Sequence, residues 1–558
     1  MSKATPLLPL LKGRLMSFPE LVNAYAVSAR ENLRGPGQAE AALSAPVAAL
    51  MRGVGELVGR RVVAHSEVTV VGDEGEAVRP DFGVRVDGVL TGHIELKAPG
   101  VSLDPATYKP RTHNGRQWQR LKELPNLLHT NGTEWRLWRY GKLVGDPRSL
   151  HVADLRTMRG SSVTFQAELE RMLTDFVLWE PAPITSVSKL VDVLAPLTRL
   201  LREEVLDVMR DERRAVRAGA SALAQPLSSL HKEWRRVLSP GADEDQFADG
   251  LAQTVVFALV LAVSEGVDVG GLPLSEVADS LTGRYGVMGR SLSLVAQPIR
   301  STPVQTAVET ITRTLSAVNW DDLGSGRSDV YLHLYEHFLS SYDPALKQAS
   351  GSYYTPVELV DAMVGWADEA VREHLGRPRG LRDSATSVID PAMGTGTYPL
   401  SVLRRVGADA ATEYGTAAAG EAVASMVGRL YGIELQSGPF SVAELRISQA
   451  VKEAGAQVPA NGLRLFVADT LEDSAATAAD EGLSWNAGLI AQQRIEANRV
   501  KRDENIQVVI GNPPYKDKAG GRGGWIENGV DPATGRAPLG RVAKGFGDVD
   551  ARVWGHVA

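Results

Sequence analysis

The chain separates into three stretches by the way in which apolar and polar positions alternate. In the first, a helical pattern at 39–57 is followed by short runs rich in β-branched and aromatic residues at 61–71, 82–96 and 135–140. Such a mixture is typical of an α/β domain, which we expect over residues 1–160. In the second, apolar residues recur at helical spacing, for example over 165–179, 186–216 and 245–263. We therefore expect an all-helical connector over residues 161–340.

The third stretch, residues 341–558, alternates short apolar runs with helical segments. The runs end in an acid or an amide, and they read TSVID, YGIEL, LFVAD and VVIGN. This rhythm predicts a parallel, doubly wound, Rossmann-like sheet, in which ligands bind at the carboxyl ends of the strands. The whole chain is thus predicted to be an α/β multidomain protein.

Composition narrows the chemistry that the chain can carry. Lys and Arg number 60, Asp and Glu number 67, the formal net charge is −7, and there is no cysteine. Disulfides, zinc–thiolate sites and a cysteine nucleophile are therefore excluded, and a metal would be held by carboxylates, carbonyls or histidine. The longest apolar run, 255–263, is shorter than the ~20 residues of a membrane span. We expect a cytoplasmic protein with no membrane segment.

A glycine-rich loop follows the first strand of the third stretch. It reads DPAMGTGT, from Asp390 to Thr397, and a helical segment follows it. Glycines at a strand-to-helix turn let the backbone approach a ligand closely, and the helix N-terminus favours negative charge. Glu434 ends the second strand, where a carboxylate can accept hydrogen bonds from a ribose diol, and Asp469 ends the third. Taken singly, each acid is better interpreted as a solvated residue after a strand.

A second motif, Asn512-Pro513-Pro514-Tyr515, follows the apolar run 507–510. Two consecutive prolines fix the backbone and remove two N–H donors, so the loop presents mainly acceptors. An exocyclic amine offers two N–H groups, which the Asn512 side-chain oxygen and the Pro513 carbonyl could accept together. Tyr515 offers a face on which a flipped base can stack. The pattern indicates chemistry on a nucleobase amine.

The two motifs together resemble those of the γ-arranged adenine-N6 DNA methyltransferases, and the upstream GSYYTP (351–356) resembles the first cofactor motif of that family. The resemblance implies S-adenosylmethionine as cofactor and activation of the amine by Asn512, Pro513, Pro514 and Tyr515. It implies cofactor contacts from Tyr354, Thr355, Pro356, Asp390, Ala392, Gly394, Gly396, Glu434 and Asp469. One feature departs from the pattern, because Glu434 lies 44 positions after Asp390 rather than the usual ~20. We attribute the excess to an alanine-rich helical insertion at 408–426.

The first stretch carries Asp81, Glu95 and Lys97, which fit the PD-(D/E)xK nuclease pattern. Glu95 and Lys97 are two apart in a strand-like run, so both side chains leave the same face. Asp81 and Glu95 could hold Mg²⁺ with its waters, and Lys97 could orient the attacking water. An ordinary half-exposed hairpin is the alternative.

The hydrophobic register offers a check on this site. The apolar positions Phe82, Val84, Val86, Ile94 and Leu96 are all even-numbered. If they share a face of an antiparallel pair, the numbers of opposing residues must add up to an even value. A two-residue turn at Asp87-Gly88 breaks this rule, so we expect an odd-length loop or a bulge, most simply with Gly88 as the central left-handed residue and 87 opposite 89. Asp81 then falls opposite Glu95.

The segment that follows, 115–141, resembles the one that follows this nuclease core in large restriction-modification polypeptides, and Gln117 is its expected site amide. Glu40, on the preceding helix, is a candidate further acid near the metal. Local positive charge for DNA phosphates would come from Lys109, Arg111, Arg116, Arg120 and Lys122.

The complete arrangement resembles single-polypeptide restriction-modification enzymes of type IIG and type ISP, although the ATP-driven helicase of type ISP is not found. The resemblance implies S-adenosylmethionine-dependent adenine methylation and Mg²⁺-dependent cleavage of unmodified double-stranded DNA. Two alternatives stay open, namely a methyltransferase subunit of a phage-defence system with a silent nuclease, and a non-catalytic DNA-binding scaffold. Tyr515 is followed by only 43 residues. We therefore expect a C-terminally incomplete methyltransferase without a target-recognition domain, which is either a fragment or truncated product or is completed by a second polypeptide.

Overall fold

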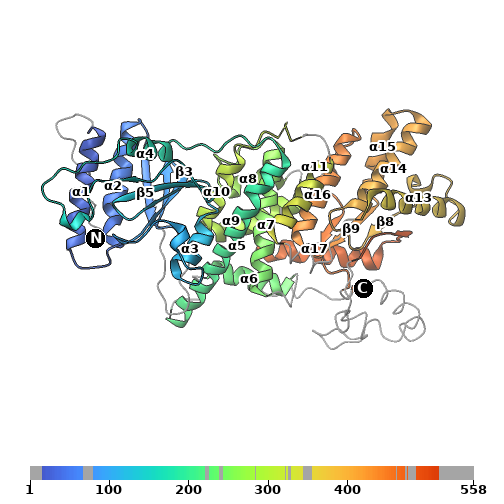
Figure 1. The fold of residues 1–558 in the computed structure, drawn as a ribbon. Helices are drawn as coiled ribbons and strands as arrows, with labels where there is room; N and C mark the ends of the chain where they lie inside the picture. Colours follow the sequence, from blue (N-terminus) through green and yellow to red (C-terminus); the bar gives the residue numbers. More distant parts are fainter. Residues whose placement is uncertain are drawn as a thin grey trace. The chain divides into compact units, whose positions relative to one another are not determined.

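The computed structural model describes residues 16–66, 79–219, 225–237, 243–282, 285–320, 322–323, 328–343, 355–459, 462–471, 474 and 485–513. The chain packs as two compact units, and Figure 1 shows the course of the chain through them. Unit 1 takes residues 1–183, 203–211 and 302–317, and unit 2 takes residues 184–202, 212–301 and 318–558. Helices of the range 161–340 therefore belong to both units.

Unit 1 is built on one mixed sheet. Its strands are β1 (Val62–Ser66), β2 (Phe82–Val86), β3 (Val89–Leu96), β4 (Leu127–Thr130), β5 (Glu134–Arg139), β6 (Lys142–Leu143) and β7 (Arg148–Ser149). They run in the order β1-β2-β3-β4-β5-β6, with β7 also paired to β5. Among the described strands of this sheet, β3 and β4 pair in parallel and the other pairs are antiparallel. β4 had no counterpart among the predicted elements, yet it is the strand beside β3.

Helices complete unit 1. They are α1 (Phe18–Arg34), α2 (Ala41–Leu57), α3 (His113–Leu121), α4 (Leu169–Val177) and α10 (Val304–Leu315), with short 3₁₀ turns at Pro105–Thr107 and Leu155–Thr157. Apolar side chains of α1, α2 and α4 form one core with Phe82, Val84, Ile94 and Leu96 of β2 and β3; this core also includes Leu21, Met51 and Phe176. The alternation that predicted the hairpin therefore reflects one buried sheet face.

The hairpin between β2 and β3 corrects one detail of the prediction. Asp87 (φ 52°) and Gly88 (φ 90°) form a two-residue turn, and Val86 pairs with Val89. The three-residue loop centred on Gly88 is therefore wrong, because an Asp-Gly pair accommodates left-handed backbone at both positions. The register shifts farther along β3, where Thr91 is the extra residue, and from there Phe82 pairs with Ile94. The bulge thus restores the expected register, in which the numbers of paired residues add up to an even value. Continued by one residue beyond Phe82 and Ile94, this register places Asp81 opposite Glu95.

The region 161–340 is helical, as the spacing predicted. Between α4 and residue 343, the described residues form helices and no strand. These are α5 (Val187–Arg217), α6 (Pro226–Val237), α7 (Glu244–Ser264), α8 (Leu274–Thr282), α9 (Gly286–Arg300), α10 and α11 (Ser328–Tyr342). By length and composition α7 could span a membrane, but 78% of its most apolar window is buried inside the protein. α7 is the kind of helix that forms the centre of a folded core.

Unit 2 contains the predicted parallel sheet. Its strands are β8 (Val388–Asp390), β9 (Leu430–Glu434), β10 (Leu465–Val467) and β11 (Val508–Val509), in the order β10-β9-β8-β11. The helices around them are α13 (Val357–His374), α14 (Thr397–Tyr414), α15 (Ala417–Val427), α16 (Ser437–Glu453) and α17 (Trp485–Asp503), with a 3₁₀ turn at Gly380–Arg382. From β8, the chain adds β9 and then β10 on one side. It then returns to the other side of β8, where it adds β11. β8 and β11 therefore flank the topological switch point of the sheet.

Successive strand residues point to opposite faces of this sheet and enter separate cores. Val388 packs with apolar residues of α13, α14 and α16, while Ile389 packs with Ala497 and Val500 of α17. The predicted alanine-rich insertion is two helices, because Gly415 (φ 88°) ends α14 and α15 then begins. The extra helix α15 accounts for the long spacing between Asp390 and Glu434.

Candidate functional site

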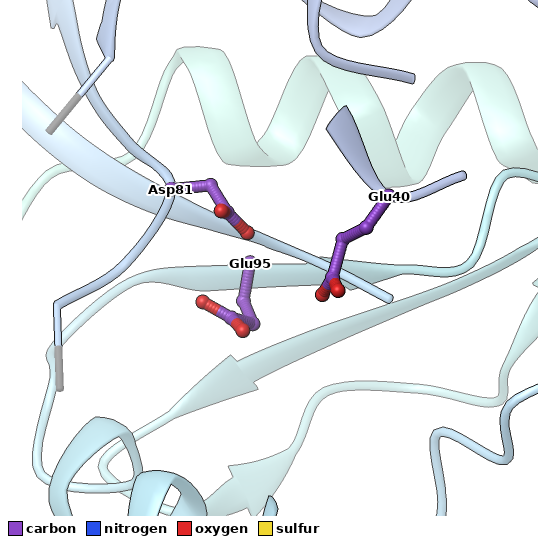
Figure 2. Close-up of side chains that lie close together, drawn as sticks. All are labelled: Glu40, Asp81 and Glu95. Atoms are coloured by element: carbon purple, nitrogen blue, oxygen red, sulfur yellow. The ribbon is translucent and has the colours of Figure 1, made fainter. Parts of the chain in front are cut away.

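Three carboxylates from separate elements meet in unit 1 (Figure 2). Glu40 immediately precedes α2, Asp81 precedes β2, and Glu95 lies within β3. One oxygen of each carboxylate lies within 4.8 Å of the others. The structure thus brings together the two predicted acids and the more distant Glu40, and oxygen donors of this kind suit Mg²⁺.

Burial makes this cluster electrostatically costly. It raises the pKa of Glu95 to about 8, and the neighbouring Asp81 adds to the effect. It also raises the pKa of Asp81 to about 6, although the Leu96 N–H donates to Asp81 Oδ2 at 2.6 Å and opposes the shift. Among the described residues, Glu95 Oε2 is buried without a hydrogen-bond partner. A bound divalent cation would satisfy this oxygen and offset the repulsion, so the residues fit a metal.

Lys97 supplies the only positive charge that the structure places in contact with these acids, within the described residues. Its Nζ donates to Glu95 Oε1 and to Gln117 Oε1, both at 2.5 Å, and lies 3.6 Å from Glu40. Burial acts to lower the pKa of Lys97, but the carboxylates of Glu95, Glu40 and Asp81 outweigh it and the pKa is raised. Lys97 is therefore charged at neutral pH, and Gln117 of α3 fixes its position.

His129 is a residue of this site that the sequence did not single out. It lies on β4 directly beside Glu95, and its ring stacks on Trp118 of α3. Burial lowers the pKa of His129 to about 3, with Lys97 contributing, so the ring is neutral. Neither ring nitrogen has a hydrogen-bond partner among the described residues. The signal was weak because β4 is a short strand that was not predicted.

The expected phosphate-contacting side chains divide into two groups. Lys109, Arg111 and Arg116 are exposed on or near α3, and Lys122, directly after α3, is half-buried. Arg120, in contrast, is largely buried and forms ion pairs with Glu204 and Asp207. The expectation for Arg120 is therefore wrong, since its guanidinium is already engaged by two carboxylates within the protein.

In unit 2, the ends of β8 and β11 bring two predicted motifs together. Asp390 ends β8, and Gly511, Asn512 and Pro513 follow β11, which is held by the bond from Ile510 N–H to the Ile389 carbonyl. A Cβ at position 511 would lie 2.4 Å from Asp390 Oδ1. Only glycine therefore lets the two loops approach this closely.

The glycine loop folds back onto the acid of the second strand. Gly394 (φ 53°) and Gly396 (φ 81°) are left-handed, and Gly396 caps α14. The Gly394 N–H donates to Glu434 Oε2 at 3.0 Å, and the Gln436 N–H donates to Glu434 Oε1 at 2.8 Å. No described atom lies within 4 Å of where a Gly394 side chain would begin. The loop thus borders open space beside a fixed carboxylate.

Asp390, the first residue of this loop, is a buried acid. It is 1% exposed, and burial raises its pKa to about 8, with the Glu434 charge adding to the shift. Its Oδ1 accepts the Ala392 N–H at 3.1 Å, whereas Oδ2 has no partner among the described residues. A cofactor that donates hydrogen bonds or carries positive charge fits this arrangement.

The remaining residues predicted to contact the cofactor or the amine are either positioned by hydrogen bonds and caps within unit 2 or lie outside the described residues. Asn512 Nδ2 donates to Thr355 Oγ1 at 2.9 Å, and Pro356, the next residue, is the N-cap of α13. Asp469 follows β10, and its Oδ1 accepts the Leu471 N–H at 2.9 Å. Tyr354, Pro514 and Tyr515 lie outside the described residues.

Arg446 of α16 was missed by the sequence analysis. It is 1% exposed, and its Nη1 donates to the Thr395 carbonyl at 2.6 Å, between the two loop glycines. A single arginine at a helical position carries no recognisable sequence signal. Its role emerges only from the contact with the loop.

Three solved structures are similar to this chain at low sequence identity. The DrdV–DNA complex is 19% identical over 90% of this chain, with a TM-score of 0.39. The ATP-dependent type ISP restriction-modification enzyme LlaBIII bound to DNA is 17% identical over 65%, with a TM-score of 0.45. The type IIG restriction endonuclease BpuSI is 12% identical over 86%, with a TM-score of 0.26. The matches span only 44%, 22% and 46% of those chains, respectively.

No curated protein sequence matches the chain. The family described as N-6 DNA Methylase matches residues 326–528, the part of unit 2 that holds the glycine loop, Glu434 and Asn512. The chain therefore carries an N6 adenine DNA methylase domain.

Proposed function

We propose that the chain is a restriction-modification enzyme that methylates adenine N6 in double-stranded DNA with S-adenosylmethionine and cleaves unmodified DNA with Mg²⁺. The methylation half is supported by one observation above all, the position of Asn512 at the switch point, between Thr355 and the loop of Asp390. The cleavage half is supported by the convergence of Glu40, Asp81 and Glu95 around Lys97.

In unit 2 the chain's own residues would bind the cofactor and present the amine. The cofactor, when bound, supplies an electrophilic methyl group on a positively charged sulfur. Asp390, Glu434 and the backbone of Gly394 and Gly396 would hold it over the open side of the loop. Asn512 Oδ1 and the Pro513 carbonyl would accept the two N–H groups of a flipped adenine. Accepting both hydrogens would raise the electron density on the nitrogen, which would take up the methyl group as the sulfur–carbon bond breaks and would release one proton to water.

In unit 1 the three carboxylates would hold Mg²⁺, which lowers the pKa of a bound water and offsets charge on the attacked phosphate. Lys97 stays protonated beside Glu95, and the Gln117 amide oxygen holds its Nζ in place. The ammonium would orient the attacking water by hydrogen bonding and would stabilise the negative charge that develops on phosphorus-bound oxygens. Exposed Lys109, Arg111 and Arg116 would contact the DNA backbone.

The test of the methylation half uses labelled S-adenosylmethionine and double-stranded DNA. We expect the full chain to transfer label to adenine N6, and Asn512→Ala to transfer almost none while still binding the cofactor in a calorimetric titration. Equal transfer by both proteins would contradict the assignment of the site.

The test of the cleavage half is separate. We expect the chain to cut unmethylated DNA with Mg²⁺ present, Asp81→Ala to leave the DNA intact, and both proteins to methylate equally. If the wild-type protein methylates but never cuts, the function is that of a methyltransferase with a silent nuclease.

A further inference from the structure

The middle of α5 carries a buried carboxylate, Glu204, that is ion-paired with two arginines of unit 1. Its Oε1 accepts from Arg79 Nε, and its Oε2 accepts from Arg120 Nη2 at 2.8 Å. The side chains of Arg79, Glu204 and Arg120 are 3%, 9% and 12% exposed, so these charges are largely removed from water. One carboxylate thus joins two separate chain segments at once.

Further acids complete the cluster. Asp211 pairs with Arg79 at 3.2 Å, and Asp207 pairs with Arg120. Burial raises the pKa of Glu204, and the positive charges of Arg120 and Arg79 oppose that shift. Such a pair is strongly cooperative, because removing one partner leaves the other charge buried and unpaired.

The two segments held by Glu204 each carry a residue of the nuclease site. Arg79 lies just before Asp81, and Arg120 lies on the same helix as Gln117. Arg79 is separated from Asp81 only by Pro80, whose ring limits backbone freedom. Arg120 lies three residues after Gln117 on α3, on the neighbouring turn of the same helical face. Gln117 in turn accepts from Lys97. Displacing either arginine would therefore move a residue that contacts the proposed metal or its lysine.

We propose that Glu204 is a positioning residue of the nuclease site, which fixes Asp81 through Arg79 and Gln117 through Arg120. The proposal rests on the proposed nuclease function. Glu204 itself touches neither metal nor DNA. Direct partners of metal ligands typically change metal affinity or activity by about 10- to 100-fold, and because Glu204 acts through Arg79 and Arg120 we expect an effect at the lower end of that range.

The test compares Glu204→Gln with Glu212→Gln in the full chain. Glu212 is a matched control, because it is also a buried carboxylate of α5, but it accepts the Leu227 and Ser228 N–H groups at the start of α6, in unit 2. Mg²⁺ binding is measured by calorimetric titration without DNA, and DNA cleavage is measured against Mg²⁺ concentration. Methyl transfer reports that unit 2 retains its fold, and calorimetric unfolding of the full chain reports whether unit 1 does.

We expect Glu204→Gln to weaken Mg²⁺ binding by about 10-fold or more and to shift the Mg²⁺ dependence of cleavage equally, with methyl transfer kept. Glu212→Gln should bind Mg²⁺ as the wild type does. Unchanged Mg²⁺ binding in Glu204→Gln, or equal loss in both variants, overturns the proposal.

Arg120→Lys provides a second variant if Glu204→Gln does not fold. It keeps the positive charge but loses the planar fork that bridges Glu204 and Asp207, so Mg²⁺ binding should again weaken. A wild-type affinity in Arg120→Lys counts against the proposal. Failure of the nuclease function itself looks different, because Asp81→Ala would then bind Mg²⁺ no worse than the wild type.

Discussion

The side-chain amide of Asn512 donates a hydrogen bond to the hydroxyl of Thr355, 157 positions earlier in the chain. This bond joins the loop after the fourth strand to the segment that leads into α13. The proposed amine-binding loop and the first cofactor motif therefore share a contact, so the position of one depends on the other.

The Asn512–Thr355 bond leads to a graded prediction. Asn512→Ala removes the amide that acts on the amine, and we expect methyl transfer to fall by at least ~100-fold, the usual effect of losing a transition-state hydrogen bond. Thr355→Val leaves the amide in place but removes the acceptor that orients it, so a smaller fall is expected at saturating cofactor concentration. Single-turnover transfer of labelled methyl measures both. A wild-type rate in Thr355→Val would show that the bond has no orienting role.

The close approach of Gly511 to Asp390 predicts that position 511 requires glycine. Gly511→Ala places a methyl 2.4 Å from Asp390 Oδ1, and we expect it to displace the loop and to weaken S-adenosylmethionine binding markedly. Gly428→Ala is the control in the same unit, because its Cβ meets nothing closer than 3.6 Å and its φ is −68°. Calorimetric titration of both variants with the cofactor distinguishes a local effect from a general one.

The raised pKa of Glu95 predicts how stability depends on pH. Its folded pKa of about 8 lies above the unfolded value of 4.5, so the folded state binds the proton more tightly. The stabilising contribution is present below about pH 4.5 and is lost as pH rises toward about 8. Without Mg²⁺ at pH 8, Glu95→Gln should therefore melt at least ~2 °C higher than the wild type.

With Mg²⁺ present, the wild type should melt at a higher temperature than Glu95→Gln. Mg²⁺ binds the folded wild type and raises its melting temperature, whereas Glu95→Gln has lost a ligand and should respond little. Differential scanning calorimetry with and without Mg²⁺ measures both effects. A wild-type protein that is insensitive to Mg²⁺ would count against a metal at this cluster.

Arg446 should support cofactor binding without touching the cofactor's reacting atoms. Arg446→Met removes the donor to the Thr395 carbonyl, and we expect the glycine loop to loosen and cofactor affinity to fall by about 10-fold, or ~1.4 kcal/mol. Arg464→Met is the comparison, because Arg464 is a more exposed arginine of the same unit that pairs with Glu504. If both variants bind the cofactor as the wild type does, the loop does not depend on Arg446.

The sequence allowed those parts of the sites to be predicted that depend on local pattern. Asp390 and Glu434 could be placed because each ends a strand, and parallel strands end at one edge of the sheet. Glu95 and Lys97 could be placed on one face because they are two apart in a strand. Even the inclusion of Asp81 followed from the parity of the apolar positions, although the turn that produces it was assigned incorrectly.

What could not be predicted depends on contacts between distant segments. The ion pairs of Arg120 with Glu204 and Asp207 join residues more than 80 positions apart, and no local pattern distinguishes them from a solvated basic surface. His129 was missed for a related reason, because its importance comes from lying beside Glu95 in a parallel pair. Parallel pairing leaves no turn or fixed spacing in the sequence.

The passage of α5 through the two units has a consequence for dividing the protein into separately expressed fragments. The chain changes unit at residues 183/184, 202/203, 211/212, 301/302 and 317/318, and two of these changes fall within α5. A fragment that stops at residue 183 would keep Arg79 and Arg120 but would lose Glu204, Asp207 and Asp211. Breaking buried pairs in this way typically costs about 3–5 kcal/mol, a large part of a domain's stability. The N-terminal unit therefore cannot be expressed as a contiguous N-terminal fragment, since its buried ion pairs need residues encoded well downstream.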